Sequence, residues 1–391
     1  MSTFQPSPRS QVAPFIAMEV LSAAVERERA GHRVIHMEVG QPGANAPTPV
    51  REAARRALDG KLGYTEALGI RELREAIAGH YRRTYGVEVA SDRVAVTAGS
   101  SGAFSLAFLA AFSPGDRIAM PTPGYPAYRN LMQALGLEAV EIECGAETRW
   151  ALTPEMIAAA HAEKPLAGVL VASPANPTGT MYTPEALDAL VKACDDLGLW
   201  FISDEIYHGL VYAGRQATAL TSSPRAIVVN SFSKYYCMTG WRIGWMVVPE
   251  VLVKSVDRLA QNLTLSNNEI SQRAALAAFD PASTAELDVV RAGYAENRKY
   301  LLNELPRLGF EDLFPVDGAF YAYASVARFS NDSLDFVKRM LAEAGVAATP
   351  GADFDGARGH RFVRFSFAGT RADMTEAVDR SEEHTSELQS H

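Results

Sequence analysis

The run AIVVNSFSK at residues 226–234 is the stretch that decides the fold. Its first five residues, Ala226–Asn230, are mostly apolar and β-branched, which is typical of a buried strand. Similar runs recur along the first two thirds of the chain. The strands predicted in this way are Arg93–Thr97, Arg117–Met120, Ala139–Ile142, Gly168–Ala172, Leu199–Ser203, Ala226–Asn230 and Arg242–Val248.

Helical patterns separate most of these strands, and they include Glu72–Tyr85, Ser101–Phe112, Tyr125–Leu135 and Pro184–Leu197. Continuous apolar strands with helices between them indicate a parallel sheet that is covered on both faces. The sequence therefore predicts an α/β fold, a three-layer sandwich around a mostly parallel central sheet.

The pattern changes after about residue 250. Long helices, Leu252–Leu263 and Ala285–Leu305, precede the isolated strands Phe320–Tyr323 and Phe362–Phe367. We expect a large domain over residues 41–270. Residues 1–40, with a helix at Ile16–Ala30, and residues 271–380 would form a smaller α+β domain.

Composition excludes several classes of protein. The chain has 391 residues, 48% of them hydrophobic, and a net charge of −9, which argues against a nucleic-acid partner. Three scattered cysteines do not make a disulfide framework or a zinc site, so a cytoplasmic location is expected. The N-terminus lacks the apolar core of a signal peptide. The longest apolar stretch, Ala103–Phe112, is too short to span a membrane.

Three charged residues stand at strand ends in a combination that indicates one cofactor. Lys234 follows the strand Ala226–Asn230, Arg242 follows Lys234, and Asp204 ends the run Leu199–Ser203. Alone, Lys234 would be a solvated charge and Asp204 a turn residue. Together they offer an amine for an aldehyde, a cation for a phosphate and a carboxylate for a basic ring nitrogen. Pyridoxal phosphate carries all three groups.

Other strand ends carry polar or aromatic side chains. Tyr207 and Asn176 could hydrogen-bond a phenolic oxygen, although a buried tyrosine and an Asn-Pro turn are ordinary features. Tyr125 could stack on the cofactor ring, or pack in a proline-rich loop. The turn at 98–102, with Ser100 and Ser101, leads into a helix whose N-terminus could hold an anion.

The remaining candidates complete two anion sites. Ser231 and Arg242 would add a hydroxyl and a guanidinium to the phosphate site. Arg364 lies in the alternating strand Phe362–Phe367, where it could face solvent or grip a substrate carboxylate with both guanidinium nitrogens. Gly40 could offer its backbone amide to the same carboxylate, or only turn the chain.

In this order, the motifs of the chain resemble those of the class I/II aminotransferases, pyridoxal-phosphate enzymes of fold type I. The segments that carry the resemblance are EVGQPG at 38–43, GYTEALG at 63–69, ANPTG at 175–179, SDEIY at 203–207, SFSK at 231–234 and VRFS at 363–366. The resemblance implies that Lys234 forms a Schiff base with the cofactor and then acts as general base and acid. It also implies ping-pong transfer of an amino group from an L-amino acid to a 2-oxo acid, with Arg364 binding the carboxylate.

The resemblance further implies a homodimer with shared active sites, in which Tyr64 reaches the partner's phosphate site. A carbon–sulfur lyase or another eliminating enzyme on the same scaffold remains an alternative. The S-x-x-K pattern of serine acylases also fits Ser231 and Lys234, but the S-D-N and K-T-G elements that those enzymes need do not occur. Transcription regulators of this fold carry a DNA-binding domain ahead of it, and the resemblance here starts near Pro14.

Two segments depart from the family pattern. The chain has Asn267-Asn268 where relatives often carry two prolines, near the expected dimer interface and substrate entrance. The last eleven residues, 381–391, resemble the translation of a DNA sequencing adapter. We expect native sequence to end near residue 380.

Overall fold

A computed structural model describes residues 4–389, with side chains through residue 382. Seven strands form its central sheet in the order β2-β8-β7-β6-β5-β3-β4. The strands are β2 (Val94–Thr97), β3 (Arg117–Thr122), β4 (Glu138–Glu143), β5 (Gly168–Ala172), β6 (Trp200–Asp204), β7 (Ile227–Ser231) and β8 (Gly244–Val247). Only β8 runs antiparallel to its neighbours in this sheet. The prediction of a mostly parallel central sheet is confirmed.

Most predicted strand bounds differ from the observed ones by one or two residues, and the difference at Arg242 affects the site. Arg242 was expected to begin the last strand, but it lies just before β8 with a left-handed φ of 49°. A left-handed residue cannot continue a ladder, and it turns the chain sharply. This turn carries the Arg242 side chain toward the start of the helix at residue 99, which it contacts.

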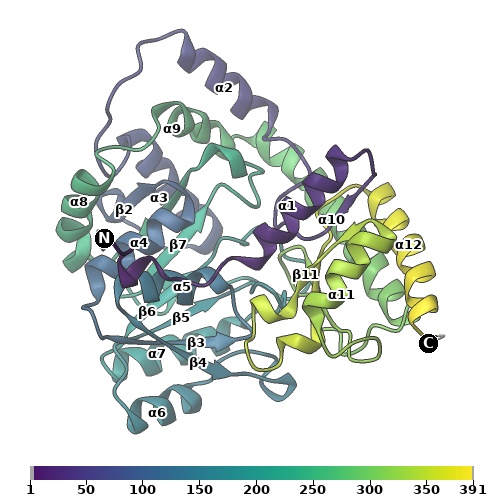
Figure 1. Ribbon diagram of the computed structural model, residues 1–391. Helices are drawn as coiled ribbons and strands as arrows, with labels where there is room; N and C mark the ends of the chain where they lie inside the picture. Colours follow the sequence, from purple (N-terminus) through teal and green to yellow (C-terminus); the bar gives the residue numbers. More distant parts are fainter. Residues whose placement is uncertain (1–3, 390–391) are drawn as a thin grey trace.

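Helices cover both faces of the central sheet (Figure 1). One face packs against helices α2, α3, α6, α7 and α9, and the other against α4, α5 and α8. The bounds are α2 (Thr48–Leu58), α3 (Arg71–Tyr85), α4 (Gly99–Ala111), α5 (Pro126–Leu135), α6 (Pro154–Glu163), α7 (Pro184–Asp196), α8 (Glu250–Leu263) and α9 (Glu269–Leu276). Neighbouring strand residues such as Phe201 and Ile202 belong to opposite cores, because side chains alternate along a strand.

The C-terminal part forms a second, smaller body around its own core. Its sheet is antiparallel, in the order β11-β12-β9, and the strands predicted as isolated pair with each other. The elements are α10 (Pro281–Arg307), β9 (Tyr321–Ser325), α11 (Ser333–Arg339), β10 (Val346–Ala347), β11 (Thr349–Pro350), β12 (Phe362–Ser366) and α12 (Arg371–Gln389). This is the smaller α+β unit that the sequence predicted.

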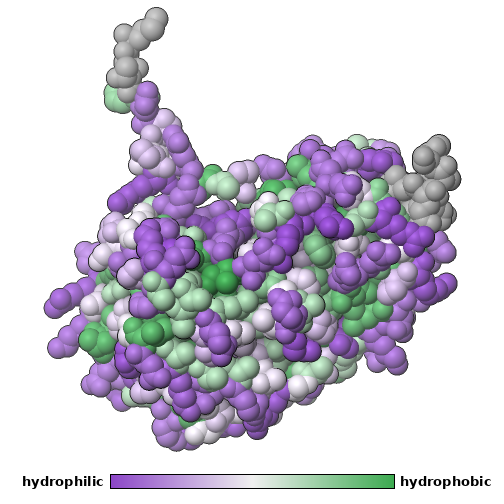
Figure 2. Space-filling model, turned by 90° about the horizontal axis from the view of Figure 1, so that it is seen from below, coloured by the Kyte–Doolittle hydropathy of each residue, from purple (hydrophilic) through white to green (hydrophobic). Residues whose placement is uncertain are grey.

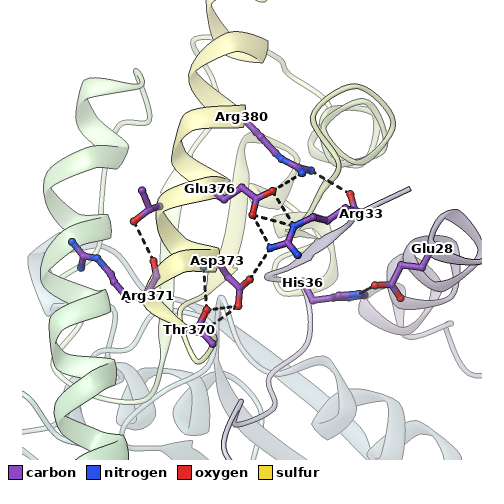
Figure 3. A network of polar contacts seen from close by, with 9 residues as sticks. Glu28, Arg33, His36, Thr370, Arg371, Asp373, Glu376 and Arg380 are labelled. Carbon is purple, nitrogen blue, oxygen red and sulfur yellow. Dashed lines mark hydrogen bonds and ion pairs between the residues drawn. The ribbon is translucent and has the colours of Figure 1, made fainter. Parts of the chain in front are cut away.

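The N-terminal segment joins this smaller body, and α1 (Ile16–Arg29) lies beside it in Figure 1. β1 (Ile35–His36) pairs with β10 in parallel. Figure 3 shows Arg33 between two acids of α12, 2.7 Å from Glu376 and 3.5 Å from Asp373. These contacts support grouping residues 20–37 with the C-terminal part. The exact domain boundaries at residues 40 and 270 stay a prediction.

Two further predictions concern the C-terminal tail and membrane-spanning segments. The helix α12 continues past residue 380, but side chains 383–391 lie outside the described residues, so the expected non-native tail stays a prediction. In the part of the chain from residue 4 to 389, none of the helices has the length and apolar character that crossing a bilayer requires.

Candidate active site

A cavity of about 410 Å³ lies at the carboxyl ends of β5, β6 and β7, between the central sheet and the smaller body. Ten of the twelve predicted site residues line it, and they are Gly40, Ser100, Ser101, Tyr125, Asn176, Asp204, Tyr207, Lys234, Arg242 and Arg364. Ser231 lies buried beneath the cavity wall, and its hydroxyl donates to the carbonyl oxygen of Ile243 (3.1 Å). Tyr64 lies outside the cavity and is 84% exposed.

Asp204 is the buried acid of the cavity. It ends β6 on the same face as Ile202, which turns its carboxylate toward α4 and α5. The Tyr128 hydroxyl, on α5, donates a short hydrogen bond to Oδ2, and the amide of Ile206 donates to Oδ1 (3.2 Å). Burial raises the pKa of the Asp204 carboxyl to about 6, while these two hydrogen bonds and nearby Lys234 lower it. The group is therefore mostly ionised at pH 7.

Lys234 is the buried amine. It lies three residues beyond β7, and its Nζ donates to the backbone carbonyl oxygen of Gly40 (2.5 Å). The same nitrogen is 5.8 Å from the centre of the Tyr207 ring. Burial lowers the pKa of Lys234 to about 8, with a further decrease from the charge of Arg364. A neutral amine is thus far more accessible here than on an ordinary surface lysine.

A cationic cup, formed by Ser100, Ser101 and Arg242, lies at the N-terminus of α4. Ser100 and Ser101 occupy the first turn of this 13-residue helix, whose leading amides have no partner within the helix. Gly99 has a φ of 71°, and a Cβ there would lie 2.6 Å from Nη2 of Arg242. Glycine therefore lets the guanidinium approach the helix start. Amides, hydroxyls and a guanidinium together suit a dianionic phosphate.

Arg364 is a second cation, held on the opposite wall. It lies on β12, the middle strand of the smaller sheet, and is only 2% exposed, so the solvent-facing alternative is wrong. Nη1 donates to Oδ1 of Asn176 (2.9 Å), and Nη2 donates to Thr349 Oγ1 (3.1 Å) and to the carbonyl oxygen of Glu38. The guanidinium is thereby fixed in one plane, as bidentate carboxylate binding requires.

Aromatic residues complete the walls, and sequence reasoning gave several of them no role. Arg364 lies 4.3 Å from the centre of the Tyr321 ring. The Tyr321 hydroxyl is 2.8 Å from that of Tyr207, and a Cβ at Gly40 would lie 1.9 Å from it. Gly40 thus has a packing reason to be glycine. The missed lining residues that are polar or aromatic are Phe15, Phe104, Ser105, Tyr128, Ser233, Thr239 and Tyr321.

The departure at Asn267-Asn268 has a structural reason. Asn268 caps α9, because its Oδ1 accepts from the amide of Ser271 (2.9 Å). Asn267 donates from Nδ2 to the carbonyl oxygen of Val96 (2.8 Å), on the strand that leads to the cationic cup. Both asparagines therefore anchor this loop.

The sequence matches the family described as aminotransferase class I and II over residues 32–380. It is 54% identical to a valine–pyruvate aminotransferase from Mycobacterium tuberculosis, over 95% of this chain and 96% of that protein. It is 35% identical to an aspartate/prephenate aminotransferase from Thermus thermophilus, over 94% of this chain and 95% of that protein.

Solved structures agree with these relatives. An aminotransferase from Mycobacterium tuberculosis superposes with a TM-score of 0.96, at 52% identity and full coverage of both chains. The Thermus thermophilus aspartate aminotransferase with maleate has a TM-score of 0.92 at 34% identity, over 97% of this chain and 100% of that one. These relatives are transaminases by name, and they give no support to the eliminating alternative. The chain belongs to the class I and II aminotransferases, and its cofactor is pyridoxal phosphate.

Proposed function

We propose that the enzyme transfers the amino group of an L-amino acid with an apolar side chain to a 2-oxo acid of similar size, by a ping-pong mechanism. The observation that carries this proposal is the composition of the cavity, in which the described cations are Lys234, Arg242 and Arg364. Each of these cations has a role in the shared chemistry. None is then left within this subunit's cavity to pair with a carboxylate on the side chain of the donor.

The fit of the cofactor rests on three groups that lie around one cavity. When bound, pyridoxal phosphate supplies an aldehyde and a ring that stabilises negative charge on a substrate carbon. The cationic cup of Ser100, Ser101 and Arg242 would hold the phosphate, with Ser231 supporting it from below. Asp204 would hold the ring nitrogen, because a buried and ionised carboxylate keeps that nitrogen protonated.

Three further residues would fix the ring in its plane. Asn176 and Tyr207 line the same wall and carry the polar groups suited to the phenolic oxygen. Tyr125 precedes α5 and would stack on the ring, with its edge supported by the ring of Tyr128 at 5.3 Å. Two polar contacts and one stacking contact restrict the ring more tightly than the phosphate alone.

Lys234 is the residue that moves protons. Its pKa of about 8 leaves about one amine in ten neutral at pH 7, against fewer than about one in a thousand for an ordinary lysine. That neutral fraction can form the Schiff base that we propose. A free amine at this position would be placed to hold and move a proton at the Cα of a bound substrate.

Arg364 would set the orientation of the substrate. A bidentate grip on the α-carboxylate leaves one rotational position for the Cα substituents, and so selects the bond that breaks. Asn176 shares this wall through its hydrogen bond to Nη1 of Arg364. The amide therefore links the carboxylate site to the cofactor site.

Two observations support a donor with an apolar side chain. The cavity wall includes Phe15, Met18, Val39, Leu131 and Ile206, none of which can pair with a charge. The 54% identical relative acts on valine and pyruvate by its name. An aspartate donor would need a second cation for its side-chain carboxylate. In this chain, that cation would have to come from outside the cavity of one subunit.

A donor panel tests the proposal. The purified enzyme is given valine, alanine, phenylalanine, aspartate or glutamate, and the loss of the cofactor's aldehyde absorbance is followed in each case. This half-reaction needs no acceptor. We expect valine to react at least ten times faster than aspartate at equal concentration. A preference for aspartate or glutamate would refute the apolar assignment but not the transamination.

We also propose a homodimer with shared active sites. Large apolar residues are exposed on two neighbouring segments, including Leu62 and Tyr64 on one and Leu263 and Leu265 on the other. The amide of Gly63 donates to Glu269 (2.8 Å), which holds these segments together. Residues 4–14 are also exposed, although residues 11 and 13 accept hydrogen bonds from Gln133 and Asn130 of α5, and a short arm of the chain projects from the body in Figure 2. Exposed apolar residues that gather on neighbouring segments are typical of a subunit interface.

Subunit complementation tests the sharing of active sites. Subunits that carry Tyr64→Ala are mixed with subunits that carry Lys234→Ala, under conditions that let them exchange. If Tyr64 serves the partner's site, each mixed dimer regains one intact site, and about a quarter of wild-type activity returns. No recovery, with mixed dimers present by mass measurement, would refute the role of Tyr64.

We finally propose a cytoplasmic location. It is supported by Cys144, Cys194 and Cys237, which are all buried as free thiols. Free thiols of this kind are usual in a reducing compartment.

A further inference from the structure

The apolar wall of the cavity is built partly by the start of α1. Phe15, Ala17 and Met18 line the cavity, although they lie far in sequence from the cofactor residues. The Phe15 ring meets the Tyr125 ring edge-on at 5.7 Å. The position of the first turn of α1 therefore decides how much room a substrate side chain has beside the cofactor.

That first turn is held by one carboxylate from another part of the chain. Asp353 accepts from the amide of Ile16 through Oδ1 (3.4 Å) and from the amide of Ala17 through Oδ2 (3.2 Å). No side chain caps α1 from its own N-cap position, Phe15. Asp353 is only 2% exposed, and a charge opposite a helix N-terminus is stabilised by its amides and dipole.

The backbone beside this carboxylate is fixed to the opposite wall. The carbonyl oxygen of Asp353 accepts from Nη2 of Arg129 (2.7 Å), which lies on α5, the helix that Tyr125 precedes. The next residue, Phe354, accepts through its carbonyl oxygen from the amide of Gly124 (3.0 Å). Its ring lies 4.8 Å from the guanidinium of Arg364. Asp353 thus joins α1 to both the cofactor wall and the carboxylate site.

We propose that Asp353 is a positioning residue that fixes the first turn of α1 over the cavity and so sets the preference for larger apolar donors. Valine or phenylalanine would reach Phe15 and Met18, whereas the methyl group of alanine is too short to gain much from them. This inference rests on the proposed apolar donor. It assigns the discrimination among apolar donors to a residue that does not line the cavity.

The test uses Asp353→Asn, which keeps the shape of the side chain, and Asp353→Ala, which removes both acceptors. The matched control is Asp332→Ala. Asp332 also accepts from two amides at a helix start, those of Leu334 (3.0 Å) and Asp335 (3.1 Å), but the helix that it caps, α11, does not line the cavity. The control therefore separates the loss of any helix cap from the loss of this one.

Two measurements are made on each variant. The first is hydrogen exchange of the amides in residues 15–20, measured without cofactor and substrate. We expect exchange to increase by about fivefold to tenfold in Asp353→Ala, less in Asp353→Asn, and not at all in the control. The second is the ratio of half-reaction efficiency (kcat/KM) for valine to that for alanine. We expect this ratio to fall by about fivefold in Asp353→Ala and to stay constant in the control.

The results of these measurements distinguish the positioning role of Asp353 from the proposed preference for an apolar donor. Unchanged exchange in both Asp353 variants would overturn the positioning role, and so would raised exchange with a constant valine-to-alanine ratio. A wild-type enzyme that prefers aspartate would instead overturn the proposed function. In that case the exchange measurement still reports whether Asp353 holds α1.

Discussion

The hydrogen bond from Tyr128 to Asp204 allows a quantitative prediction for Tyr128→Phe. Both side chains are buried, and the phenol donates to the charged form of the acid. A hydrogen bond to a charged group contributes about 1.5–3 kcal/mol, and 1.36 kcal/mol corresponds to about one pKa unit. Because the bond favours the ionised form, its removal should raise the pKa of Asp204 from about 6 to between roughly 7 and 8.

This shift should change the affinity for the cofactor in a pH-dependent way. At pH 7 the ionised fraction of Asp204 would fall from about nine tenths to between roughly one half and one tenth. Only the ionised acid holds a protonated ring nitrogen well, so the Kd for pyridoxal phosphate should rise about twofold to tenfold. At pH 9 the acid is again ionised in both proteins, and the difference should largely disappear.

The assay is a titration of cofactor-free protein with pyridoxal phosphate between pH 6.5 and 9, followed by absorbance. The informative quantity is the ratio of the variant Kd to the wild-type Kd, because the ionisation of Lys234 affects both proteins. Tyr182→Phe is a suitable control, since it removes another buried hydroxyl, one that accepts from Leu152 (2.8 Å), away from Asp204. A ratio that is raised equally at every pH would refute the electrostatic explanation and leave only lost packing.

Three further predictions follow from the same groups. Lys234→Ala should abolish turnover and the visible absorbance of the attached cofactor; normal activity would overturn the assignment of this lysine. Arg364→Gln should raise KM for the donor by about 100-fold, because a buried cation for the carboxylate is lost, and it should also raise the pKa of Lys234, which the charge of Arg364 lowers. The observed rate at which cofactor attaches to the wild-type enzyme should increase with pH through a midpoint near 8, because only the neutral amine reacts; a midpoint near 10 would mean that Lys234 is solvated.

The central sheet and the convergence of its strand ends could be predicted from the sequence. Buried parallel strands are nearly continuous apolar runs, so β5, β6 and β7 stand out against the helices. The carboxyl ends of parallel strands meet at one edge of a sheet. For that reason the sequence alone predicts that Asn176, Asp204 and Lys234, each at or just after a strand end, lie together.

The contacts between side chains could not be predicted in the same way. Tyr128 lies one turn after Tyr125 on α5, but only the rotation of that helix on the sheet decides that its hydroxyl meets Asp204. The cap on α1 comes from Asp353, more than 300 residues away in the chain. Neither contact leaves a periodic signal, because each depends on how two separately formed elements pack.

Arg364 shows why alternation along a strand is an incomplete guide. The alternation within Phe362–Ser366 predicts two faces for this strand, and the face that carries a charged residue ordinarily points to solvent. Here the face is covered, because the guanidinium contacts Asn176, the Phe354 ring and the Thr349 side chain, which β11 places opposite Arg364. β11 has only two residues, Thr349 and Pro350, which is too short to give a strand signal. The burial of the arginine therefore depends on contacts with segments distant in the chain, one of which is too short to be recognised as a strand in the sequence.

The pair Asp204 and Glu205 shows what the register of one strand decides. The two acids are adjacent and both are buried, so composition alone cannot say which one serves the cavity. Alternation places Asp204 with Ile202 on the α4 and α5 face, and Glu205 with Ser203 on the other. Burial raises the pKa of Glu205 to about 8, so it is mostly neutral at pH 7, whereas Asp204 is mostly ionised. A shift of one residue in β6 would turn Asp204 away from the cavity, and the hydrogen bonds from Tyr128 and the Ile206 amide that favour its ionised form would be lost.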